Sequence, residues 1–113
     1  MAFRRGDVVL IPFPFADLSA AKTRPAVVVS SDLYYAIRSE LLLAFVSSQI
    51  AQANPILDYI LHDWEAAGLL KPSFVRPKIA AIGPALVAHH VGTLSDRDLQ
   101  EVNWRLRQAL DLA

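Results

Sequence analysis

Arg24 is the residue of this chain whose type and surroundings are best suited to chemistry. It follows a loop that includes Asp17, Ser19 and residues 20–23, and it stands directly before Pro25, which biases the preceding residue toward an extended backbone. A guanidinium is always charged and can donate to two oxygens of one anion. If the chain is an enzyme, we therefore expect Arg24, at the mouth of a two-stranded hairpin, to carry its chemistry. Taken alone, the residue is more simply a surface arginine at the start of a strand.

Small polar side chains follow an apolar strand expected at residues 41–46. Ser47, Ser48 and Gln49 stand where this strand leaves the core, and such strand ends often line sites. The alternative is that the Ser47 hydroxyl only satisfies nearby backbone groups. The residues alone do not separate these two interpretations.

Charge is balanced over the whole chain but unevenly placed. The 11 Lys and Arg residues equal the 11 Asp and Glu residues, so no overall charge draws the protein to nucleic acid or to an anionic membrane. Any site for a polyanion must therefore be local. Basic residues gather in two stretches, Arg4, Arg5, Lys22 and Arg24 and then Lys71, Arg76 and Lys78, with the acidic Asp58, Asp63 and Glu65 between them. We expect a bipolar surface.

The composition excludes several classes of protein. Cysteine is absent from the 113 residues, which excludes disulfides, thiolate catalysis and cysteine metal sites. No apolar run reaches the roughly 18 residues of a membrane span, and the first residues lack the apolar core of a signal peptide. We expect a soluble, cytoplasmic protein without cofactor or metal, folded as a single domain over residues 1–113.

The pattern of apolar residues predicts short strands. Strands are expected at residues 8–15, 26–30, 41–46, 57–61 and 73–82, with a turn of helix within 31–40 and a turn at 62–68. Pro12 and Pro14 indicate an edge or a bend in the first strand. The runs 26–30 and 41–46 are almost continuously apolar, which is typical of strands buried on both faces.

A C-terminal helix is the clearest expected element. Ser95 is its predicted N-cap, and Asp98 three residues later completes a pattern similar to a capping box. Apolar residues then recur at helical spacing and should form one face against the core: Leu99, Val102, Leu106, Ala109 and Leu110. Together these elements predict a mainly β fold, a small curled barrel with the helix packed on it.

Several motifs resemble those of the PemK/MazF/Kid family of toxin endoribonucleases, over nearly the whole chain. They are RGDVVLIPFPF at residues 5–15, KTRPAVVVS at 22–30, the Ser47-Ser48-Gln49 strand end, and the stretches 70–73 and 91–95. The resemblance implies an SH3-like barrel of the MazF/PemK/CcdB type that forms a homodimer. It also implies a toxin that cuts single-stranded mRNA without a metal, halts translation and growth, and is held inactive by an antitoxin from the same operon.

Metal-free cleavage of RNA proceeds when the 2'-hydroxyl attacks its own phosphodiester, which leaves a 2',3'-cyclic phosphate and a 5'-hydroxyl. Such a reaction needs a proton acceptor, a proton donor and groups that stabilise charge on the transition state. The resemblance places Arg24 at the position of the family's catalytic arginine and Ser47 where a catalytic threonine is usual. We expect six further residues to bind RNA: Lys22, Thr23, Ser48, Gln49, Arg76 and Lys78.

The proton acceptor is not assigned by the sequence. Several relatives carry an arginine and a carboxylate on the strand that corresponds to residues 73–82, whereas this chain has no acid there and two alanines at residues 80 and 81. Arg24 in a double role would be inefficient because of its high pKa. Asp17, His89 and His90 remain candidates, although two histidines in a loop before a helix are more often solvated.

Aromatic side chains are a second possible contact for unpaired bases. We expect stacking on Tyr34, Tyr35 or Phe74 if they are exposed. Three other phenylalanines, Phe13, Phe15 and Phe45, are expected in the core or in a dimer interface.

Two other functions fit the same fold. A CcdB-type toxin shares the barrel but acts by binding gyrase, and the Arg-Pro hairpin with the Ser-Ser-Gln strand end favours the ribonuclease over it. A catalytically inactive module that only binds an antitoxin is the second alternative, and the missing acid on the strand at 73–82 is its best argument.

Overall fold

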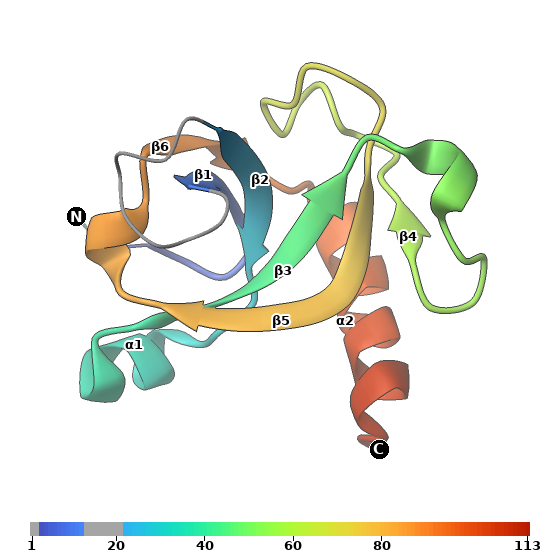
Figure 1. Ribbon diagram of the computed structural model, residues 1–113. Helices are drawn as coiled ribbons and strands as arrows, with labels where there is room; N and C mark the ends of the chain where they lie inside the picture. The colour runs from blue at the N-terminus through green and yellow to red at the C-terminus, as the bar shows by residue number, and fades with distance from the viewer. Residues whose placement is uncertain (1–2, 13–21) are drawn as a thin grey trace.

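The computed structural model describes residues 3–12 and 22–113 and shows one curled antiparallel sheet with a C-terminal helix packed on it (Figure 1). The sheet has six strands in the order β4-β5-β3-β2-β1-β6. Its strands are β1 (Asp7–Pro12), β2 (Thr23–Val28), β3 (Leu41–Ser47), β4 (Tyr59–Ile60), β5 (Phe74–Ile82) and β6 (His89–Thr93). The helices are α1 (Asp32–Arg38) and α2 (Asp96–Leu110), with 3-10 turns η1 (Ile50–Gln52) and η2 (Pro84–Leu86). The predicted barrel with a C-terminal helix is confirmed.

β1 and β2 form the predicted hairpin. Their register pairs Ile11 with Arg24 and Pro12 with Thr23, so Arg24 stands at the open end of the pair. Pro12 is the last residue of β1 and is buried. The expected extension of this strand to residue 15, with Pro14, lies outside the described residues.

The central strands are buried on both faces, as their apolar runs predicted. Val8 and Val27 belong to one core cluster, which also includes Val102 of α2. Their neighbours Val9 and Ala26 belong to a second cluster on the other face. Because side chains alternate along a strand, continuous apolar runs are needed to fill both clusters.

Other predicted elements are confirmed with changes in length. The helix expected within 31–40 is α1, with the Ser31 side chain accepting from the Tyr34 backbone N–H. The strand expected at 57–61 is reduced to β4, and residues 62–68 form a turn. The strand expected at 73–82 is β5, in which Pro77 is accommodated.

Two predictions about the last third of the chain were wrong. His89 and His90 are not in a loop but begin β6, an edge strand that pairs with β1 across an irregularity between Val8 and Val9. The apolar face of α2 is also shorter than expected. Val102 and Leu106 are buried, whereas Ala109 and Leu110 are exposed because α2 extends past the edge of the sheet.

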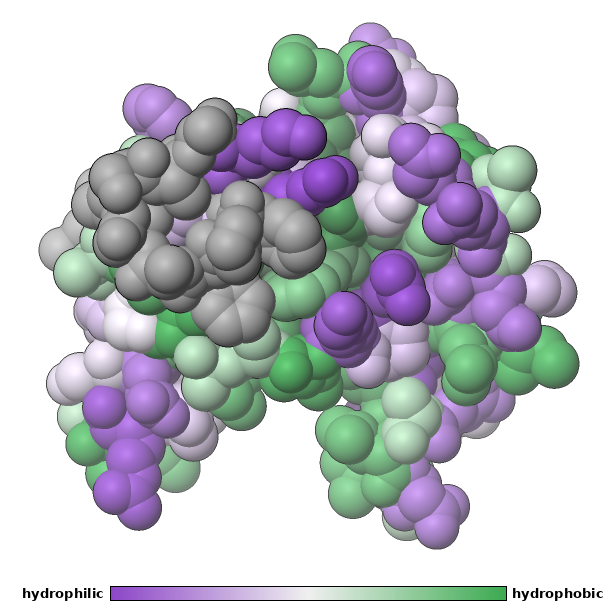
Figure 2. Space-filling model, viewed as in Figure 1, coloured by the Kyte–Doolittle hydropathy of each residue, from purple (hydrophilic) through white to green (hydrophobic). Residues whose placement is uncertain are grey.

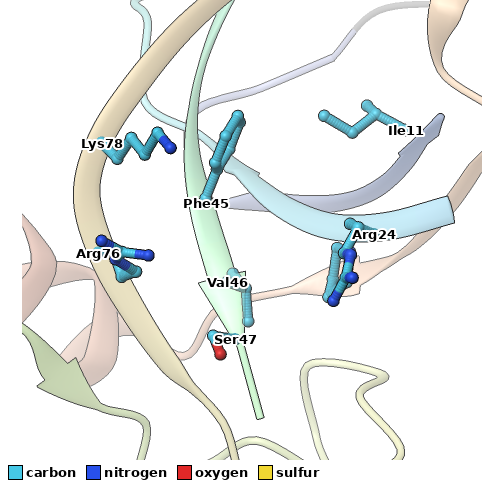
Figure 3. A pocket seen from close by; sticks show the side chains of 8 residues that line it. Ile11, Arg24, Phe45, Val46, Ser47, Arg76 and Lys78 are labelled. Atoms are coloured by element: carbon cyan, nitrogen blue, oxygen red, sulfur yellow. The ribbon is translucent and has the colours of Figure 1, made fainter. Parts of the chain in front are cut away.

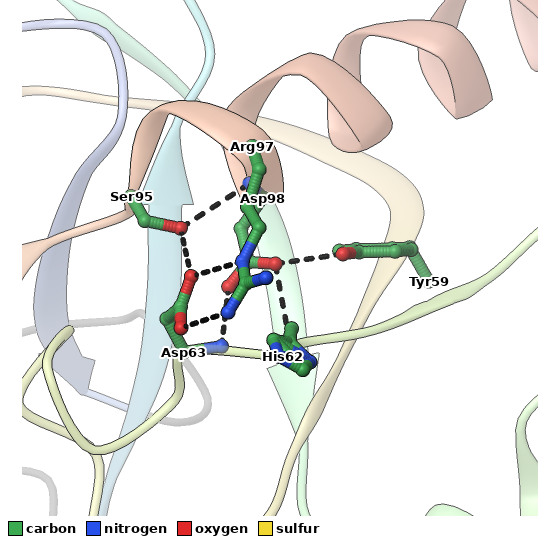
Figure 4. Close-up of polar contacts among 6 residues, drawn as sticks. All are labelled: Tyr59, His62, Asp63, Ser95, Arg97 and Asp98. Atoms are coloured by element: carbon green, nitrogen blue, oxygen red, sulfur yellow. Dashed lines mark hydrogen bonds and ion pairs between the residues drawn. The ribbon is translucent and has the colours of Figure 1, made fainter.

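Asp98 has a different role from the one predicted. Ser95 is the N-cap of α2 and accepts from the backbone N–H of Asp98, as expected. The Asp98 carboxylate, however, is fully buried and accepts from the Tyr59 hydroxyl at 2.7 Å, the His62 N–H at 3.1 Å and the Asp63 N–H at 2.8 Å (Figure 4). It therefore attaches the 62–68 turn and β4 to the start of α2, instead of capping its own helix.

Asp63 completes this polar cluster at its exposed side. Its carboxylate accepts two hydrogen bonds from Arg97 and one from the Ser95 hydroxyl. These bonds, with Arg97 as the larger cause, hold the pKa of Asp63 well below its usual range. Burial and the bond to Asp98 raise the pKa of Tyr59, so its hydroxyl remains a donor to the carboxylate.

We predict that Asp98→Ala destabilises the fold by about 3 kcal/mol, because it leaves three donors at a buried position without their acceptor. Asp96→Ala is the control, since this carboxylate is exposed in the same first turn and should matter by less than about 1 kcal/mol. Urea denaturation of both variants measures the difference. Equal stability of the two would show that the buried carboxylate does not hold the turn to the helix.

Gly68 and Gly92 allow two backbone segments to touch. A Cβ on Gly92 would lie 2.2 Å from the carbonyl oxygen of Ala67, and a Cβ on Gly68 would lie 2.1 Å from that of Val91. Gly68 also has a φ of +89°, which favours glycine. The 62–68 turn therefore lies directly against β6.

We predict that Gly92→Ala destabilises the protein by about 3 kcal/mol, since the methyl group must displace backbone and not a flexible side chain. Gly83→Ala is the matched control, because nothing lies within 4 Å of a Cβ there; its effect should stay within about 0.5 kcal/mol. Thermal unfolding followed by circular dichroism compares them. A Gly92→Ala protein as stable as the control would contradict the close contact.

No helix in the described part of the chain is both long and apolar enough to cross a membrane.

Candidate active site

A pocket of about 150 Å³ opens where β1, β2, β3 and β5 lie next to one another (Figure 3). Its lining is Ile11, Arg24, Pro25, Phe45, Val46, Ser47, Arg76 and Lys78. Four of the residues predicted for the site, Arg24, Ser47, Arg76 and Lys78, are therefore brought together by the fold. The sequence separates them widely, and the pairing of β3 with both β2 and β5 makes them neighbours.

Arg24 reaches this pocket from the open end of the β1–β2 hairpin. The residue is exposed and lines the concavity, as Figure 3 shows, and Pro25 beside it lines the same pocket. Arg24 is thus at the predicted place, at the mouth of the hairpin. Its catalytic role stays a prediction.

Ser47 is the last residue of β3 and faces the pocket from the sheet. Its Oγ accepts from the backbone N–H of Gln49 at 3.1 Å. Both interpretations of this serine therefore apply, because it satisfies a backbone group and lines the pocket. The hydroxyl proton is a donor that this bond does not use.

Arg76 and Lys78 approach from β5. Both line the pocket from the part of β5 where its pairing with β3 is irregular, between the Val46–Val75 and Ala44–Ile79 pairs. The Lys78 Nζ lies 5.6 Å from the centroid of the Phe45 ring, a cation–π distance. Together with Arg24 they place three cationic side chains around the pocket, and no carboxylate of residues 3–12 and 22–113 is part of its lining. The site is locally positive although the chain has no net charge.

Depressions on either side continue the pocket. One, of about 450 Å³, shares Pro25 with it and is lined by Thr23, Ser48 and Lys71 among others. The other, of about 310 Å³, shares Arg76 and Lys78 and adds the side chains of Gln52, Asn54 and Asp58. The three hollows can accommodate an extended polymer on both sides of the pocket.

The remaining predicted RNA-binding residues are less central. Thr23 and Ser48 line the neighbouring depression but not the pocket itself. Lys22 and Gln49 are exposed and line neither of these hollows. Their contacts with RNA stay predictions.

Neither candidate histidine lies in the pocket lining. His90 Nε2 is 3.5 Å from Asp7 Oδ1, and both histidines lie on β6, which borders β1 on the side away from β2. Asp17 lies outside the described residues. The proton acceptor is therefore still unassigned.

The predicted aromatic contacts need correction. Phe74 is 2% exposed and cannot stack on a base. Tyr34 and Tyr35 lie on α1, which joins the end of β2 to the start of β3, away from the Arg24 end; the Tyr34 hydroxyl donates to Glu40 and Tyr35 packs on the core. Phe45 is instead the aromatic wall of the pocket and not simply a core residue. Its position two residues before Ser47, on the same strand face, is the signal that could have found it.

Phe13 and Phe15, expected in the core or in an interface, lie outside the described residues.

The basic residues of the first quarter do not form one patch. The Arg5 Nε donates to the Val29 carbonyl at 3.0 Å, in a different pocket from that of Arg24. The acidic stretch is likewise divided, because Asp63 is engaged by Arg97 and Ser95. The expected bipolar surface was wrong in this respect, since both stretches are divided among separate structural roles.

Metal ligands are not gathered anywhere in residues 3–12 and 22–113. No group of three or more His, Asp or Glu side chains there is placed to hold an ion.

The family model described as the PemK-like, MazF-like toxin of type II toxin-antitoxin systems matches residues 4–110. The chain belongs to this family. The resemblance of its motifs is thereby confirmed, and the protein is a type II toxin of the PemK/MazF kind. No curated protein sequence is similar enough to match.

Solved structures of PemK/MazF-like toxins share the fold over the whole chain. An endoribonuclease from a mycobacterial species, in complex with its cognate antitoxin, is 17% identical with a TM-score of 0.80 and covers 99% of this chain and 98% of its own. MazF of Deinococcus radiodurans is 22% identical with a TM-score of 0.74 and 99% coverage of both chains, and a MazE-MazF structure from the same organism is 18% identical with a TM-score of 0.77, covering 100% and 99%.

We predict that this PemK/MazF-like toxin binds single-stranded RNA in a salt-dependent way, because the pocket neutralises phosphates with cations. Arg76→Gln and Lys78→Gln should each reduce the slope of log K against log salt by about 0.7. Fluorescence anisotropy with a cleavage-resistant 2'-O-methyl oligonucleotide measures this slope. Arg38→Gln, an exposed arginine on α1, is the control and should leave it unchanged; a flat salt response in all variants would exclude the pocket as the contact surface.

Proposed function

We propose that this protein is a metal-independent, sequence-specific endoribonuclease that cleaves single-stranded mRNA and thereby inhibits translation and growth. The observation that carries the proposal is the convergence of Arg24, Ser47, Arg76 and Lys78 on one pocket, which brings three cations and a hydroxyl together. Phosphodiester cleavage develops negative charge on phosphate oxygens, and prearranged cations and donors stabilise such charge. Membership in the toxin family supports the same activity.

The proposed reaction is a transesterification within the substrate. The 2'-oxygen forms a bond to phosphorus as its proton passes to a base, and the bond from phosphorus to the 5'-oxygen breaks as that oxygen gains a proton. The products are a 2',3'-cyclic phosphate and a 5'-hydroxyl. Arg24 donates to the non-bridging oxygens in the transition state, and Ser47 donates to a phosphate oxygen or orients the 2'-hydroxyl.

Arg76 and Lys78 serve binding in this scheme. They line both the pocket and the adjoining depression, so they can contact the phosphates that flank the scissile one. Phe45, whose ring lies beneath Lys78, offers an aromatic surface for a base next to the cleaved bond.

The same basic pocket is also a candidate binding site for a protein partner. Two of the structurally similar toxins were crystallised with their antitoxins, and we propose that this chain also has a cognate antitoxin whose acidic segment occupies the basic pocket. We further propose that the toxin acts as a homodimer in the cytoplasm.

An inactive, antitoxin-binding module is the second candidate function. The observation that favours it is that, among the residues the structure describes, no carboxylate or histidine lines the pocket, and none of these residues is an evident base for the 2'-hydroxyl. The cations would then serve only to hold an acidic partner.

We predict that Arg24→Ala lowers RNA cleavage about 100- to 1000-fold, the range seen when one donor to a developing oxyanion is removed. Folding should be unchanged, because Arg24 is exposed at the end of its strand. Cleavage of a single-stranded RNA pool in EDTA, with sequencing of the ends, tests both the residue and the chemistry. The expected ends are 2',3'-cyclic phosphate and 5'-hydroxyl.

Arg38→Ala is the matched control and should cleave at the wild-type rate. Cleavage by Arg24→Ala at that rate would remove the proposed catalytic residue, and a requirement for added magnesium would contradict the proposed reaction. Antitoxin binding without any cleavage by the wild-type protein would establish the inactive module instead.

A further inference from the structure

The depression beside the candidate active site contains a carboxylate among its cations. Its volume is about 310 Å³, and it shares Arg76 and Lys78 with the pocket of that site. Its other polar side chains are those of Gln52, Asn54 and Asp58. Figure 2 shows hydrophilic side chains over β5 and over the segment between η1 and β4. A negative charge weakens a surface that binds phosphates, so Asp58 calls for a different role from the cations beside it.

Asp58 is held in place from two sides. Its backbone carbonyl accepts from Arg105 Nε at 3.4 Å, and its Oδ2 accepts from the backbone N–H of Asn54 at 2.8 Å. In residues 3–12 and 22–113, no Lys, Arg or His side chain lies within 4 Å of its carboxylate. The position of Asp58 is therefore fixed, while its charge is not neutralised by an ion pair.

The simplest role for this carboxylate is to close the turn at residues 54–58. The backbone N–H of Asp58 also donates to the Asn54 carbonyl at 3.0 Å, so the two residues bind each other twice. A carboxylate, however, has about four acceptor positions, and the turn uses one of them. The described part of the chain supplies no further donor to this group. Both oxygens can thus accept from a ligand while the turn stays closed.

An oriented amide lies beside this carboxylate. Asn54 Oδ1 accepts from the backbone N–H groups of Ile56 at 2.9 Å and of Leu57 at 3.0 Å, which leaves its Nδ2 group as a donor. Leu57, which is 44% exposed, and Pro77 add apolar surface to the same hollow. The hollow therefore combines two adjacent acceptors, an amide donor and an apolar surface.

Guanine is the RNA base whose Watson–Crick edge fits this combination. It has two neighbouring donors, N1–H and N2–H2, followed by the acceptor O6. Adenine and cytosine each have a single amino group, and uracil has a single N3–H. A carboxylate that accepts from two adjacent donors therefore selects guanine, and an amide N–H beside it can donate to O6.

The mixed charges of the hollow also favour a nucleotide over a protein segment. An acidic segment is repelled by Asp58, and a basic one is repelled by Arg76 and Lys78. A nucleotide carries its negative charge on the phosphate and presents a neutral base. Its phosphate can lie at the cations while its base lies at the carboxylate.

We propose that Asp58 is a specificity-determining residue that recognises a guanine base of the RNA. The Asp58 carboxylate accepts from N1–H and N2–H2, Asn54 Nδ2 donates to O6, and the base packs on the apolar surface of the hollow. The phosphate of the same nucleotide lies at Arg76 or Lys78, next to the scissile phosphate. This inference rests on the proposed ribonuclease function and names one base of its substrate.

The first test is a comparison of guanosine with inosine, which lacks only the N2 amino group. The probe is a short, cleavage-resistant 2'-O-methyl oligouridylate with one guanosine or one inosine, and fluorescence anisotropy measures its binding to the full chain. We expect the wild-type protein to bind the guanosine oligonucleotide about tenfold more tightly. Equal binding of the two oligonucleotides overturns the proposal.

Asp58→Asn should abolish this preference for guanosine. The ratio of the two affinities is the readout, because loss of a negative charge strengthens phosphate binding to any sequence. The new amide keeps an oxygen that can accept from the Asn54 N–H and close the turn. Asp32→Asn, an exposed aspartate of α1 that does not line the hollow, is the matched control and should keep the wild-type ratio. A wild-type ratio in Asp58→Asn overturns the proposal.

Asn54→Asp is a second variant that keeps the turn. It retains the oxygen that binds the Ile56 and Leu57 N–H groups, and it replaces the donor to O6 by an acceptor. Its preference for guanosine over adenosine should fall about tenfold relative to the wild-type protein. An undiminished preference overturns the assignment of Asn54.

Sequencing of the ends cut from an RNA pool separates this proposal from the ribonuclease itself. We expect guanosine at one fixed position of the wild-type cleavage motif and its loss from that position in Asp58→Asn. Cleavage at motifs without guanosine overturns the role of Asp58 but leaves the ribonuclease. Guanosine-selective binding without cleavage supports the role of Asp58 and overturns the ribonuclease. Binding of a basic peptide that depends on Asp58, without guanosine selectivity, assigns the hollow to a protein and overturns the proposal.

Discussion

The pairing of β3 with two neighbours is the constraint on which the rest of this structure depends. β3 is hydrogen-bonded to β2 on one side and to β5 on the other. Arg24 at the start of β2 and the Arg76–Lys78 segment of β5 thereby come to opposite sides of Phe45 and Ser47. A shift of one residue in either register would turn the side chains of that strand to the other face. The buried residues on both faces of β3 resist such a shift, so the core determines the geometry of the pocket.

A buried carboxylate fixes the other half of the molecule. Asp98 gathers a tyrosine hydroxyl and two backbone N–H groups from β4 and the following turn. The turn then lies against β6 through Gly68 and Gly92, where backbone meets backbone. The buried negative charge of Asp98 is tolerated because these donors form hydrogen bonds to the carboxylate. The positive end of the α2 helix dipole also favours an anion there. The 62–68 turn is thus attached to the fold by its hydrogen bonds to α2.

The fold places the basic side chains in two separate pockets. The cations near the hairpin mouth and on β5 form one positive pocket, whereas Arg5 and Arg107 form another beside α2. Two acidic side chains, those of Asp63 and Asp98, are engaged in hydrogen bonds within the protein. A chain with zero net charge can therefore present two concave positive surfaces. Each offers anions a site at short range, while the molecule as a whole has little long-range attraction for polyanions.

The sequence by itself determined the elements whose signals are local. Apolar runs identified β2, β3 and β5, Ser95 identified the start of α2, and the Arg-Pro pair placed Arg24 at the end of a hairpin. The family motifs extended this to the barrel and to the main site residues. The predictions of strands and helices succeeded because propensity, capping and hydrophobic pattern act between residues close in the chain, whereas the roles of the site residues stay predictions.

Tertiary structure alone decided which residues share a pocket and which charges are paired. Phe45 became a pocket wall, Phe74 became core, and Asp98 became an acceptor for a distant turn instead of a cap. Arg5 was separated from Arg24 although both are basic and near in sequence. Strand register, the path of α2 and the burial of each face set these outcomes, and they depend on contacts between residues far apart in the chain, which no local pattern contains.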